Sequence, residues 1–282
     1  MRHLRGLATL ADAYDGFIVD LWGVVHDGVR PYPGAISCLA ALRDQGKPLV
    51  LLSNAPRRAA SARTALRAMG IADDLYTDLV TSGEAVHRAL RERADPWFAS
   101  LGRRVFHLGP ERDRNVYTGL DLEPVPTPAG ASFVLNTGPD DEADPTDLAA
   151  FAPVLAACRA ASLPMICANP DLDVIRDGVR MLCAGALAQQ YAMLGGDVRS
   201  LGKPDPAIYG PVIDRLGVPP GRILAIGDSL RTDIAGAAAC GIDACWVLGG
   251  IHADELAAGL DPADAARAVG LAPVATLSAL IW

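Results

Sequence analysis

The sequence predicts an α/β protein with a Rossmann-like parallel-sheet core, interrupted by a second α/β domain. Short apolar runs alternate with helical patterns over residues 1–70, and the same alternation returns near the end of the chain. The stretch between these halves has a different texture, with loops rich in Pro, Gly and Asp. We therefore expect a core formed by residues 1–81 and 197–282, with an inserted domain at 82–196.

The first half of the core contains two strands and two helices in alternation. We expect them, in order, at 17–20 (strand), 33–45 (helix), 48–53 (strand) and 57–69 (helix). Pro33 near the start of the first helix and Gly46 just past its end are typical helix boundaries. Strands that alternate with helices at this spacing predict parallel pairing with right-handed crossovers.

The remaining elements follow the same reasoning. In the second half of the core we expect a helix at 206–216, a strand at 223–226, a helix at 232–239 and a strand at 244–248. Gly217 and Gly241 close the two helices. The inserted domain has three expected strands, at 104–108, 132–136 and 164–168.

Composition and charge exclude several classes of function. The chain has 25 basic and 33 acidic residues and no Lys/Arg-rich run, which disfavours nucleic acid as a partner. Six scattered cysteines, with no zinc-ligand spacing, indicate free buried thiols in a reducing compartment. We find no signal peptide and no apolar run near the roughly 20 residues of a membrane span, so we expect a cytoplasmic protein.

Carboxylates follow two of the expected core strands. Asp20 ends the strand at 17–20, and Asp228 and Asp233 come directly after the strand at 223–226. A carboxylate at the end of a buried strand is costly to desolvate unless it holds a metal or reacts. In open parallel sheets these strand ends are where ligands bind. The pattern indicates a hard-cation site that also contains a candidate nucleophile.

Three further polar residues are expected at the same edge. Ser53 and Asn54 end the strand at 48–53, and Lys203 lies in a stiff, Pro-flanked turn. Taken singly, three residues of this edge have an ordinary alternative: Ser53 as a helix cap, Lys203 as a solvated charge and Asp233 as a first-turn acid. Their joint occurrence after successive strands favours phosphoryl transfer. In this interpretation Asp20 and Asp228 hold Mg²⁺, and Asp233 is an additional partner.

These residues resemble the haloacid dehalogenase (HAD) superfamily of aspartyl phosphotransferases. The matching elements are Asp20-x-Trp22-Gly23-Val24, Ser53-Asn54, Lys203 and the segment 227–233. The position of the insertion, between the Ser and Lys elements, is similar to subclass IIA, the p-nitrophenylphosphatase-like group with a large α/β cap. The resemblance implies an Asp20 nucleophile, phosphate binding by Ser53 and Lys203, a metal ligand at Asp228, and a small phosphorylated metabolite as substrate.

The chain departs from this family at Trp22, where phosphatases usually carry a second Asp that donates and accepts protons. An indole has no usable pKa for that task, although the Trp22 backbone carbonyl still offers a metal ligand. His26, just beyond the nucleophile, is the candidate replacement. A loop histidine packed against the cap is the alternative role for His26.

The inserted domain offers candidate substrate contacts at Asn169 and Asp171, although an Asn-Pro-Asp turn is the ordinary alternative there. Capped enzymes of this kind often associate through the cap, so the resemblance allows a homo-oligomer, whereas the residues themselves do not specify the oligomeric state. Two other functions stay open. Trp22 favours a catalytically silent relative that binds a phosphorylated ligand. A metal-independent dehalogenase is the other, and the retained Asp228 and Asp233 argue against it.

Overall fold

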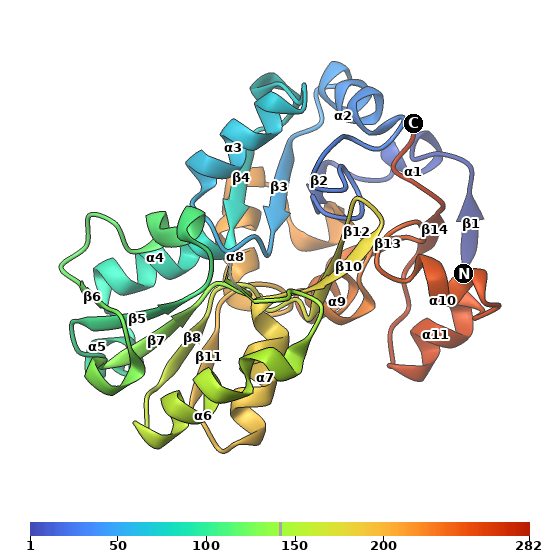
Figure 1. The fold of residues 1–282 in the computed structure, drawn as a ribbon. Coiled ribbons are helices and arrows are strands. Elements are labelled where there is room, and N and C mark those ends of the chain that lie inside the picture. Colours follow the sequence, from blue (N-terminus) through green and yellow to red (C-terminus); the bar gives the residue numbers. More distant parts are fainter. Residues whose placement is uncertain (141–142) are drawn as a thin grey trace.

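The structure is a computed structural model that describes residues 1–140 and 143–282. It contains two α/β units that meet at the carboxyl ends of the core strands (Figure 1). The predicted fold class, a parallel-sheet α/β core with an inserted α/β unit, is confirmed. Among the described residues, no helix is long and apolar enough to span a membrane. The six cysteines are free, and all except Cys240 are buried.

The core is built on a seven-stranded parallel sheet. In spatial order the strands are β1 (Arg2–Leu4), β14 (Ala275–Leu277), β13 (Asp243–Val247), β12 (Ile223–Gly227), β2 (Gly16–Val19), β3 (Leu49–Ser53) and β4 (Asp78–Thr81). The short strands β1, β4 and β14 were not predicted, because three or four residues carry too little pattern to recognise.

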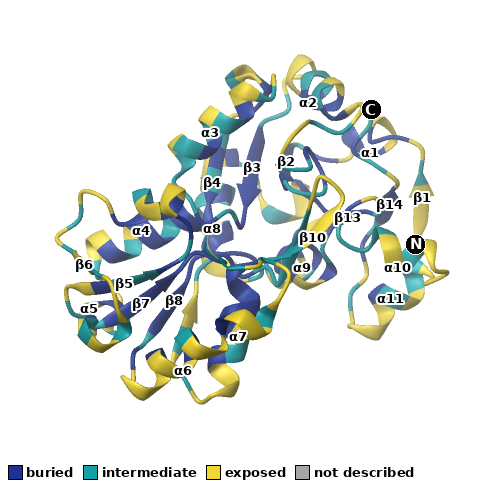
Figure 2. Cartoon of the chain, viewed as in Figure 1, coloured by how far each residue is buried: buried dark blue, intermediate teal, exposed yellow. Residues whose placement is uncertain are grey.

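Helices cover both faces of this sheet. One face packs against α1 (Ala8–Ala11), α2 (Ala35–Asp44) and α3 (Ala59–Ala68), and the other against α8 (Pro206–Leu216), α9 (Ala235–Ala239) and α11 (Pro262–Ala268). Within β2, Phe17 and Val19 face the first set of helices and Ile18 faces the second. Strand residues buried on both faces explain the continuous apolar runs in the sequence, and the central strands are fully buried (Figure 2).

The inserted unit has its own parallel sheet. Its strands, in spatial order, are β11 (Val198–Ser200), β8 (Met165–Cys167), β7 (Phe133–Asn136), β5 (Arg104–Leu108) and β6 (Glu123–Val125). Helices α4 (Ser82–Glu92) and α5 (Pro96–Ser100) pack on one face, and α6 (Ala152–Ala160) and α7 (Ala184–Met193) on the other. We call this unit the cap.

The sequence placed the boundaries of the cap at 82 and 196. Helix α4 begins at Ser82 and packs on the cap sheet, whereas β11 extends that sheet beyond 196 by pairing with β8. A strand is assigned to the sheet with which it forms hydrogen bonds, so we propose that the cap ends at Ser200 and the core resumes there.

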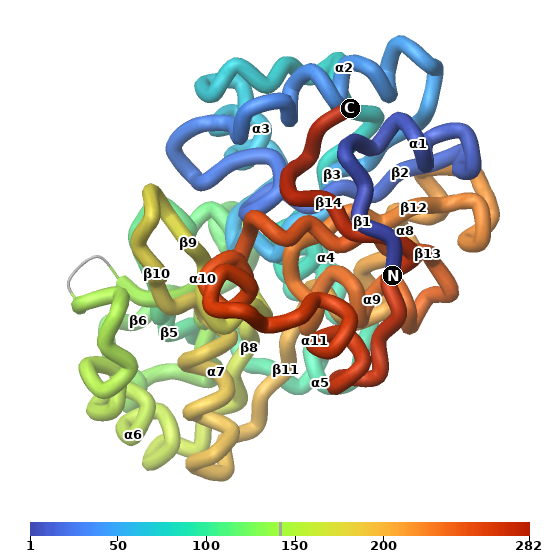
Figure 3. Tube along the Cα trace, turned by 90° about the vertical axis from the view of Figure 1, so that its right-hand side faces the viewer, coloured from blue at the N-terminus to red at the C-terminus, as the bar shows by residue number. Residues whose placement is uncertain are grey.

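An antiparallel hairpin, β9 (Asp173–Arg176) and β10 (Val179–Leu182), extends from the cap toward the core (Figure 3). Asp177 and Gly178 form its turn with φ of 48° and 80°. An Asp-Gly pair between two short β-prone segments is a strong hairpin signal, and it accounts for this turn, which was not among the predicted elements. Arg180 of the hairpin donates to the carbonyl of Ile251 at 2.9 Å, in the loop before α10 (Ala253–Ala257).

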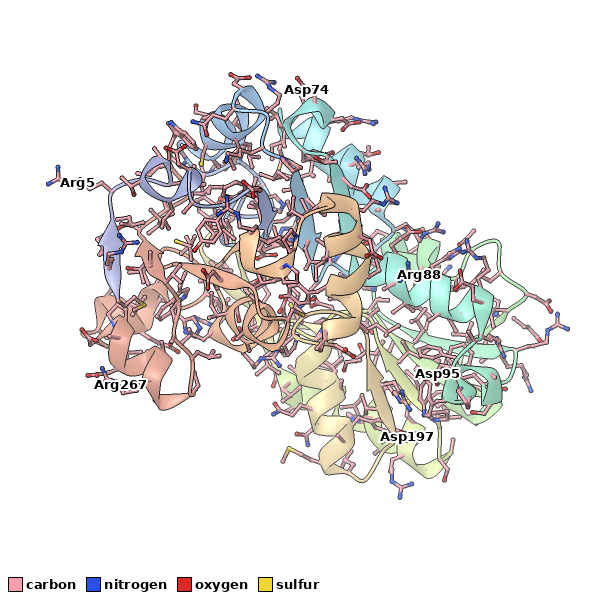
Figure 4. All side chains as sticks on the ribbon, turned by 180° about the vertical axis from the view of Figure 1, so that it is seen from behind. Arg5, Asp74, Arg88, Asp95, Asp197 and Arg267 are labelled. Carbon is pink, nitrogen blue, oxygen red and sulfur yellow. The ribbon has the colours of Figure 1, made fainter. Side chains whose placement is uncertain are left out.

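The exposed surface carries charges of both signs on both units. The labelled side chains Arg88, Asp95 and Asp197 lie around the cap, and Arg5, Asp74 and Arg267 lie around the core (Figure 4). Many of these charges pair locally, as Arg267 does with Asp264 at 2.6 Å. Both units therefore present charges of either sign to the solvent.

Candidate active site

The strand ends bring the predicted acidic residues to one place. In the register of the sheet, Val19 of β2 pairs with Ile226 of β12 and with Leu51 of β3, so the three strands end at nearly the same level. The backbone N–H of Asp20 donates to Ile226 at 2.9 Å. Asp20 and Asp228 therefore begin the loops at the carboxyl edge, directly under the cap.

Asp20, Asp228 and Asp233 form a buried carboxylate cluster. Each offers one oxygen, and the three oxygens lie within 4.8 Å of one another. Burial and the neighbouring Asp233 raise the pKa of Asp20 well above its usual range, and burial together with Asp20 does the same for Asp228. Clustered, desolvated carboxylates of this kind fit a divalent cation, which offsets their mutual repulsion.

Two glycines make room for the Asp228 carboxylate. A Cβ on Gly23 would lie 1.9 Å from Asp228 Oδ2, and a Cβ on Gly250 would lie 2.0 Å from the same atom. Gly23 also has a φ of +75°, which favours glycine. The carboxylate accepts a hydrogen bond from the N–H of Ile251 at 2.7 Å. The pocket thus holds Asp228 in one position and leaves no space for a bulkier neighbour.

Lys203 lies between two of these carboxylates. Its Nζ donates to Asp20 Oδ1 at 2.6 Å, to Asp233 Oδ1 at 2.6 Å and to the carbonyl of Leu52 at 3.0 Å. Burial alone would lower the pKa of Lys203, but Asp20 and Asp233 outweigh burial and raise it well above the ordinary value. The ammonium group is therefore a fixed positive charge in direct contact with the candidate nucleophile.

Asp233 is held on both of its oxygens. Oδ1 accepts from Lys203, and Oδ2 accepts from the N–H of Ser229 at 3.1 Å. A π-helical turn, Leu230–Ile234, precedes α9 and starts earlier than the predicted helix at 232–239. In this turn the N–H groups of Asp233 and Ile234 both donate to the carbonyl of Ser229. Asp233 thus holds Lys203 and the loop at Ser229 through its two oxygens, and one of these oxygens also belongs to the carboxylate cluster.

Asn54 connects the core to the cap. Its Oδ1 accepts from the N–H of Lys203 at 2.8 Å, and its Nδ2 donates to Asp171 Oδ1 at 2.9 Å. Asn54 is 2% exposed; its bond to Lys203 is buried, and its bond to Asp171 is partly buried. Ser53, beside it, accepts the N–H of Ala55 through Oγ at 3.2 Å and keeps its own hydroxyl proton for another acceptor.

On the cap side, Asn169 and Asp171 lie in the loop after β8. Asn169 Oδ1 accepts from the N–H of Asp171 at 3.0 Å, which is the turn geometry that the Asn-Pro-Asp sequence favours. Both residues line a cavity of about 400 Å³ between cap and core. Asp171 also lines a second cavity, of about 200 Å³, that contains Asp20, Asp228 and Asp233. Asn169 therefore shapes the loop, and Asp171 is exposed to both cavities.

Trp22 and His26 pack against each other in the loop after β2. Their rings meet edge to face with centroids 5.2 Å apart, and His26 Nδ1 accepts from the N–H of Gly28 at 3.0 Å. A Cβ on Gly28 would lie 2.1 Å from the Trp22 ring, so the indole rests directly on this glycine. Trp22 lines both cavities. His26 lines neither cavity and is 4% exposed.

The surroundings of His26 do not favour the predicted role in proton exchange. Burial lowers its pKa to about 4, so the ring stays neutral near pH 7. We expect His26→Asn, which keeps an acceptor for the Gly28 N–H, to change turnover by less than about threefold, well below the 10²–10⁴-fold of general acid–base catalysis. Steady-state kinetics on any phosphoester that the wild type hydrolyses would check this, and a hundredfold loss of kcat would restore His26 as the acid.

Two contributors to the site were not identified from the sequence. Arg231 lines the smaller cavity and donates to the carbonyl of Pro170, which joins the core to the cap loop. The Gly249–Gly250 pair after β13 opens the loop whose Ile251 N–H holds Asp228. The sequence did contain a signal for the Gly249–Gly250 loop, because a glycine pair directly after a buried strand is typical of a ligand-binding turn at this edge of the sheet.

Comparison with known proteins identifies the family. A family model described as haloacid dehalogenase-like hydrolase matches residues 17–123, and one described as HAD-hydrolase-like matches residues 200–276. A haloacid dehalogenase-like hydrolase from Brucella suis 1330 has a solved structure that is 35% identical, with a TM-score of 0.84, covering 99% of this chain and 100% of that chain.

Two characterised relatives are also similar along most of this chain. Chronophin of Bos taurus is 31% identical over 89% of this chain and 88% of its own length. D-glycerol 3-phosphate phosphatase of Mycobacterium tuberculosis is 28% identical over 87% of this chain, which spans 66% of the length of that enzyme. A structure of the mycobacterial glycerol phosphate phosphatase in complex with calcium has a TM-score of 0.62, at 27% identity, over 86% of this chain and 68% of that one. The chain belongs to the haloacid dehalogenase superfamily, in its p-nitrophenylphosphatase-like subclass IIA.

Proposed function

We propose that this chain is a Mg²⁺-dependent phosphohydrolase of a small phosphorylated metabolite that works through an aspartyl-phosphate on Asp20. The observation that carries the proposal is the buried cluster of Asp20, Asp228 and Asp233 at one sheet edge, with the Lys203 ammonium in contact with two of its members. A nucleophile, a hard-cation site and a fixed positive charge are what phosphoryl transfer requires.

Asp20, Asp228 and the backbone carbonyl of Trp22 are the groups that would hold the metal, with Asp233 supporting them through Lys203. Their oxygens and buried negative charge suit a small hard cation. When bound, the ion would neutralise negative charge on the phosphoryl oxygens and on the carboxylates around them. The mycobacterial relative was solved with calcium, and our choice of Mg²⁺ rests on the carboxylate donor set.

The residues of the chain have distinct roles in the proposed reaction. Asp20 attacks phosphorus in line and forms an acyl phosphate, which water then hydrolyses. The hydroxyl of Ser53 and the ammonium of Lys203 stabilise the charge spread over the phosphoryl oxygens. Asn54 fixes Lys203 through its backbone N–H at 2.8 Å and so holds the ammonium beside Asp20. The cap encloses the strand ends and limits access of water.

The substrate is expected to be small. The cap-side cavity of about 400 Å³ is at the lower end of the range for small-molecule sites. The relative named for D-glycerol 3-phosphate makes phosphorylated polyols a reasonable first class to assay. A cytoplasmic location and association of copies through the cap stay predictions from the sequence.

Metal removal tests the proposed cofactor. We expect p-nitrophenyl phosphate, or a member of a panel of phosphorylated metabolites, to be hydrolysed in Mg²⁺ and at least about 100-fold more slowly in EDTA, because the ion supplies several kcal/mol of charge stabilisation. Activity should return when excess Mg²⁺ is added. Equal turnover in EDTA and in Mg²⁺ would contradict the proposed metal site and favour the metal-independent alternative.

Trp22 favours one other function, a phospholigand-binding protein without turnover. The indole occupies the position of the expected proton donor and lines both cavities. If no phosphorylated compound is turned over with Mg²⁺ present, while phosphate or a phosphorylated metabolite still binds, this second function is correct.

A further inference from the structure

The proposed hydrolysis needs a group that gives a proton to the leaving oxygen and later takes one from water. Trp22 cannot act in this way, and the ring of His26 is buried outside both cavities. The inference that follows rests on the proposed function, because it names the residue that would move this proton.

Asp171 occupies the right place for this task. It lies on the cap loop after β8, whereas the nucleophile Asp20 follows β2 of the core, so the two residues reach the same cavity from opposite units. Asp171 lines the smaller cavity together with Asp20 and also the larger, cap-side cavity. If a phosphoester bound with its phosphoryl group at Asp20 and its alcohol part in the cap-side cavity, the bond between the two parts would lie near Asp171.

The carboxyl group of Asp171 is held from several sides. Its backbone N–H donates to Asn169 Oδ1 at 3.0 Å, and its carbonyl accepts from the N–H of Gly185 at 3.1 Å. Oδ1 accepts from Asn54 Nδ2 at 2.9 Å, whereas Oδ2 accepts no hydrogen bond within residues 1–140 and 143–282. Arg231 fixes the preceding Pro170 carbonyl. One oxygen is therefore anchored and the other is available to a ligand.

The charges that face Asp171 come from both units. Burial raises the pKa of Asp171, and the charge of Asp233 adds to this rise. The charges of Lys203 and Arg231 and the hydrogen bond from Asn54 oppose it. Asp171 in turn raises the pKa values of Asp20 and Asp228 in the core and of Cys183 and Cys167 in the cap. A carboxyl group that resists ionisation in this setting can donate a proton and then accept one.

We propose that Asp171 is the general acid and base of this enzyme and replaces the carboxyl group missing at Trp22. In the first step Asp20 forms a bond to phosphorus, the bond from phosphorus to the leaving oxygen breaks, and the proton of Asp171 passes to that oxygen. In the second step the Asp171 carboxylate takes a proton from water. The water oxygen bonds to phosphorus, the bond to Asp20 breaks, and phosphate leaves.

Leaving-group dependence tests this role, because loss of an acid harms poor leaving groups most. Wild type and Asp171→Asn, which keeps the acceptor for Asn54, are compared on glycerol 3-phosphate and on p-nitrophenyl phosphate with Mg²⁺. We expect the variant to turn over the alkyl ester about 10²–10⁴-fold more slowly than wild type does. If wild type does not hydrolyse glycerol 3-phosphate, another alkyl phosphate that it hydrolyses takes its place. With p-nitrophenyl phosphate we expect a stoichiometric burst of p-nitrophenolate followed by slow turnover, since the base is also missing.

The control is Asp177→Asn, which makes the same change at the exposed tip of the cap hairpin and should match wild type with both esters. Asp171→Ala provides a second readout, in which added formate should restore turnover by serving as the missing acid and base. The inference is wrong if Asp171→Asn slows both esters equally without a burst, if it slows neither, or if formate has no effect on the alanine variant. Inactive wild type on every ester would instead reject the proposed function, and with it this inference.

Discussion

Replacing Asp20 with asparagine should abolish turnover and leave a folded protein that still binds phosphate. The amide cannot form an acyl phosphate, so we expect the rate to fall by at least about 10³-fold. Stability should change little, because the new amide oxygen accepts the bond from Lys203 Nζ and one of three crowded carboxylates is removed. Steady-state kinetics, thermal unfolding and phosphate binding measure the three parts of this expectation.

Asp20→Asn also distinguishes the two candidate functions. If wild type turns over a phosphoester and the variant does not, Asp20 acts chemically. If neither protein turns over any ester and both bind phosphorylated ligand equally well, the chain is the silent binder. Asp15→Asn is a suitable control, since Asp15 pairs with Arg222 on the surface at 2.7 Å and lies outside the site. Turnover by Asp20→Asn at the wild-type rate would exclude the proposed nucleophile.

Replacing Lys203 with methionine should cost both activity and stability. Methionine matches the volume of lysine, but it leaves Asp20 and Asp233 buried without their shared cation and the Leu52 carbonyl without a donor. Removing one partner of a buried ion pair typically costs about 3–5 kcal/mol. We expect a loss of that size in the free energy of unfolding by urea, and at least a 10²-fold lower kcat from the lost charge stabilisation.

The only other lysine in the chain provides the control. Lys47 donates to the carbonyl of Tyr14 at 2.7 Å and contacts no member of the carboxylate cluster. Lys47→Met should therefore change the free energy of unfolding by less than about 1 kcal/mol and leave kcat unaltered. If Lys203→Met proves as stable as Lys47→Met, the contacts of Lys203 with Asp20 and Asp233 do not stabilise the fold, and this prediction is wrong.

Much of the core could be predicted from the sequence because long apolar runs and glycine stops are strong local signals. The helix at 206–216 was predicted with the bounds it has in α8, and the strands β2, β3, β12 and β13 were each placed within a residue or two. Short strands such as β1 and β14 are specified by pairing with distant segments. Their three residues carry no period of their own, so the sequence alone did not reveal them.

The candidate site was predicted less evenly. Asp20, Asp228 and Lys203 follow strands, and parallel pairing is sufficient to bring them together. Which of them touch depends on side-chain packing, which the sequence does not encode locally. The double contact of Lys203 with Asp20 and Asp233 arises from the loop before α8 and the π-helical turn before α9, and neither geometry is visible in residue spacing.

Side-chain packing also explains why His26 and Asp171 differ as candidates for proton transfer. His26 is close to Asp20 in sequence, yet its ring packs against Trp22 and Gly28 outside both cavities. Asp171 is 151 positions away in sequence from Asp20, but the cap loop delivers it to the cavity that contains the nucleophile. Proximity along the chain favoured His26 as the proton donor. The sequence marked Asp171 only as a candidate substrate contact, and the folded arrangement of core and cap is what suggests a proton-transfer role for it.

Direct detection of the covalent intermediate is the most decisive measurement for this protein. The Asp171→Asn variant is mixed with p-nitrophenyl phosphate and Mg²⁺, quenched with acid and digested, and the peptides are examined by mass spectrometry. The proposed mechanism predicts a phosphoryl group on the peptide that contains Asp20, and none in a protein that also carries Asp20→Asn. Hydrolysis of the ester without phosphorylation of Asp20 at any quench time would contradict it.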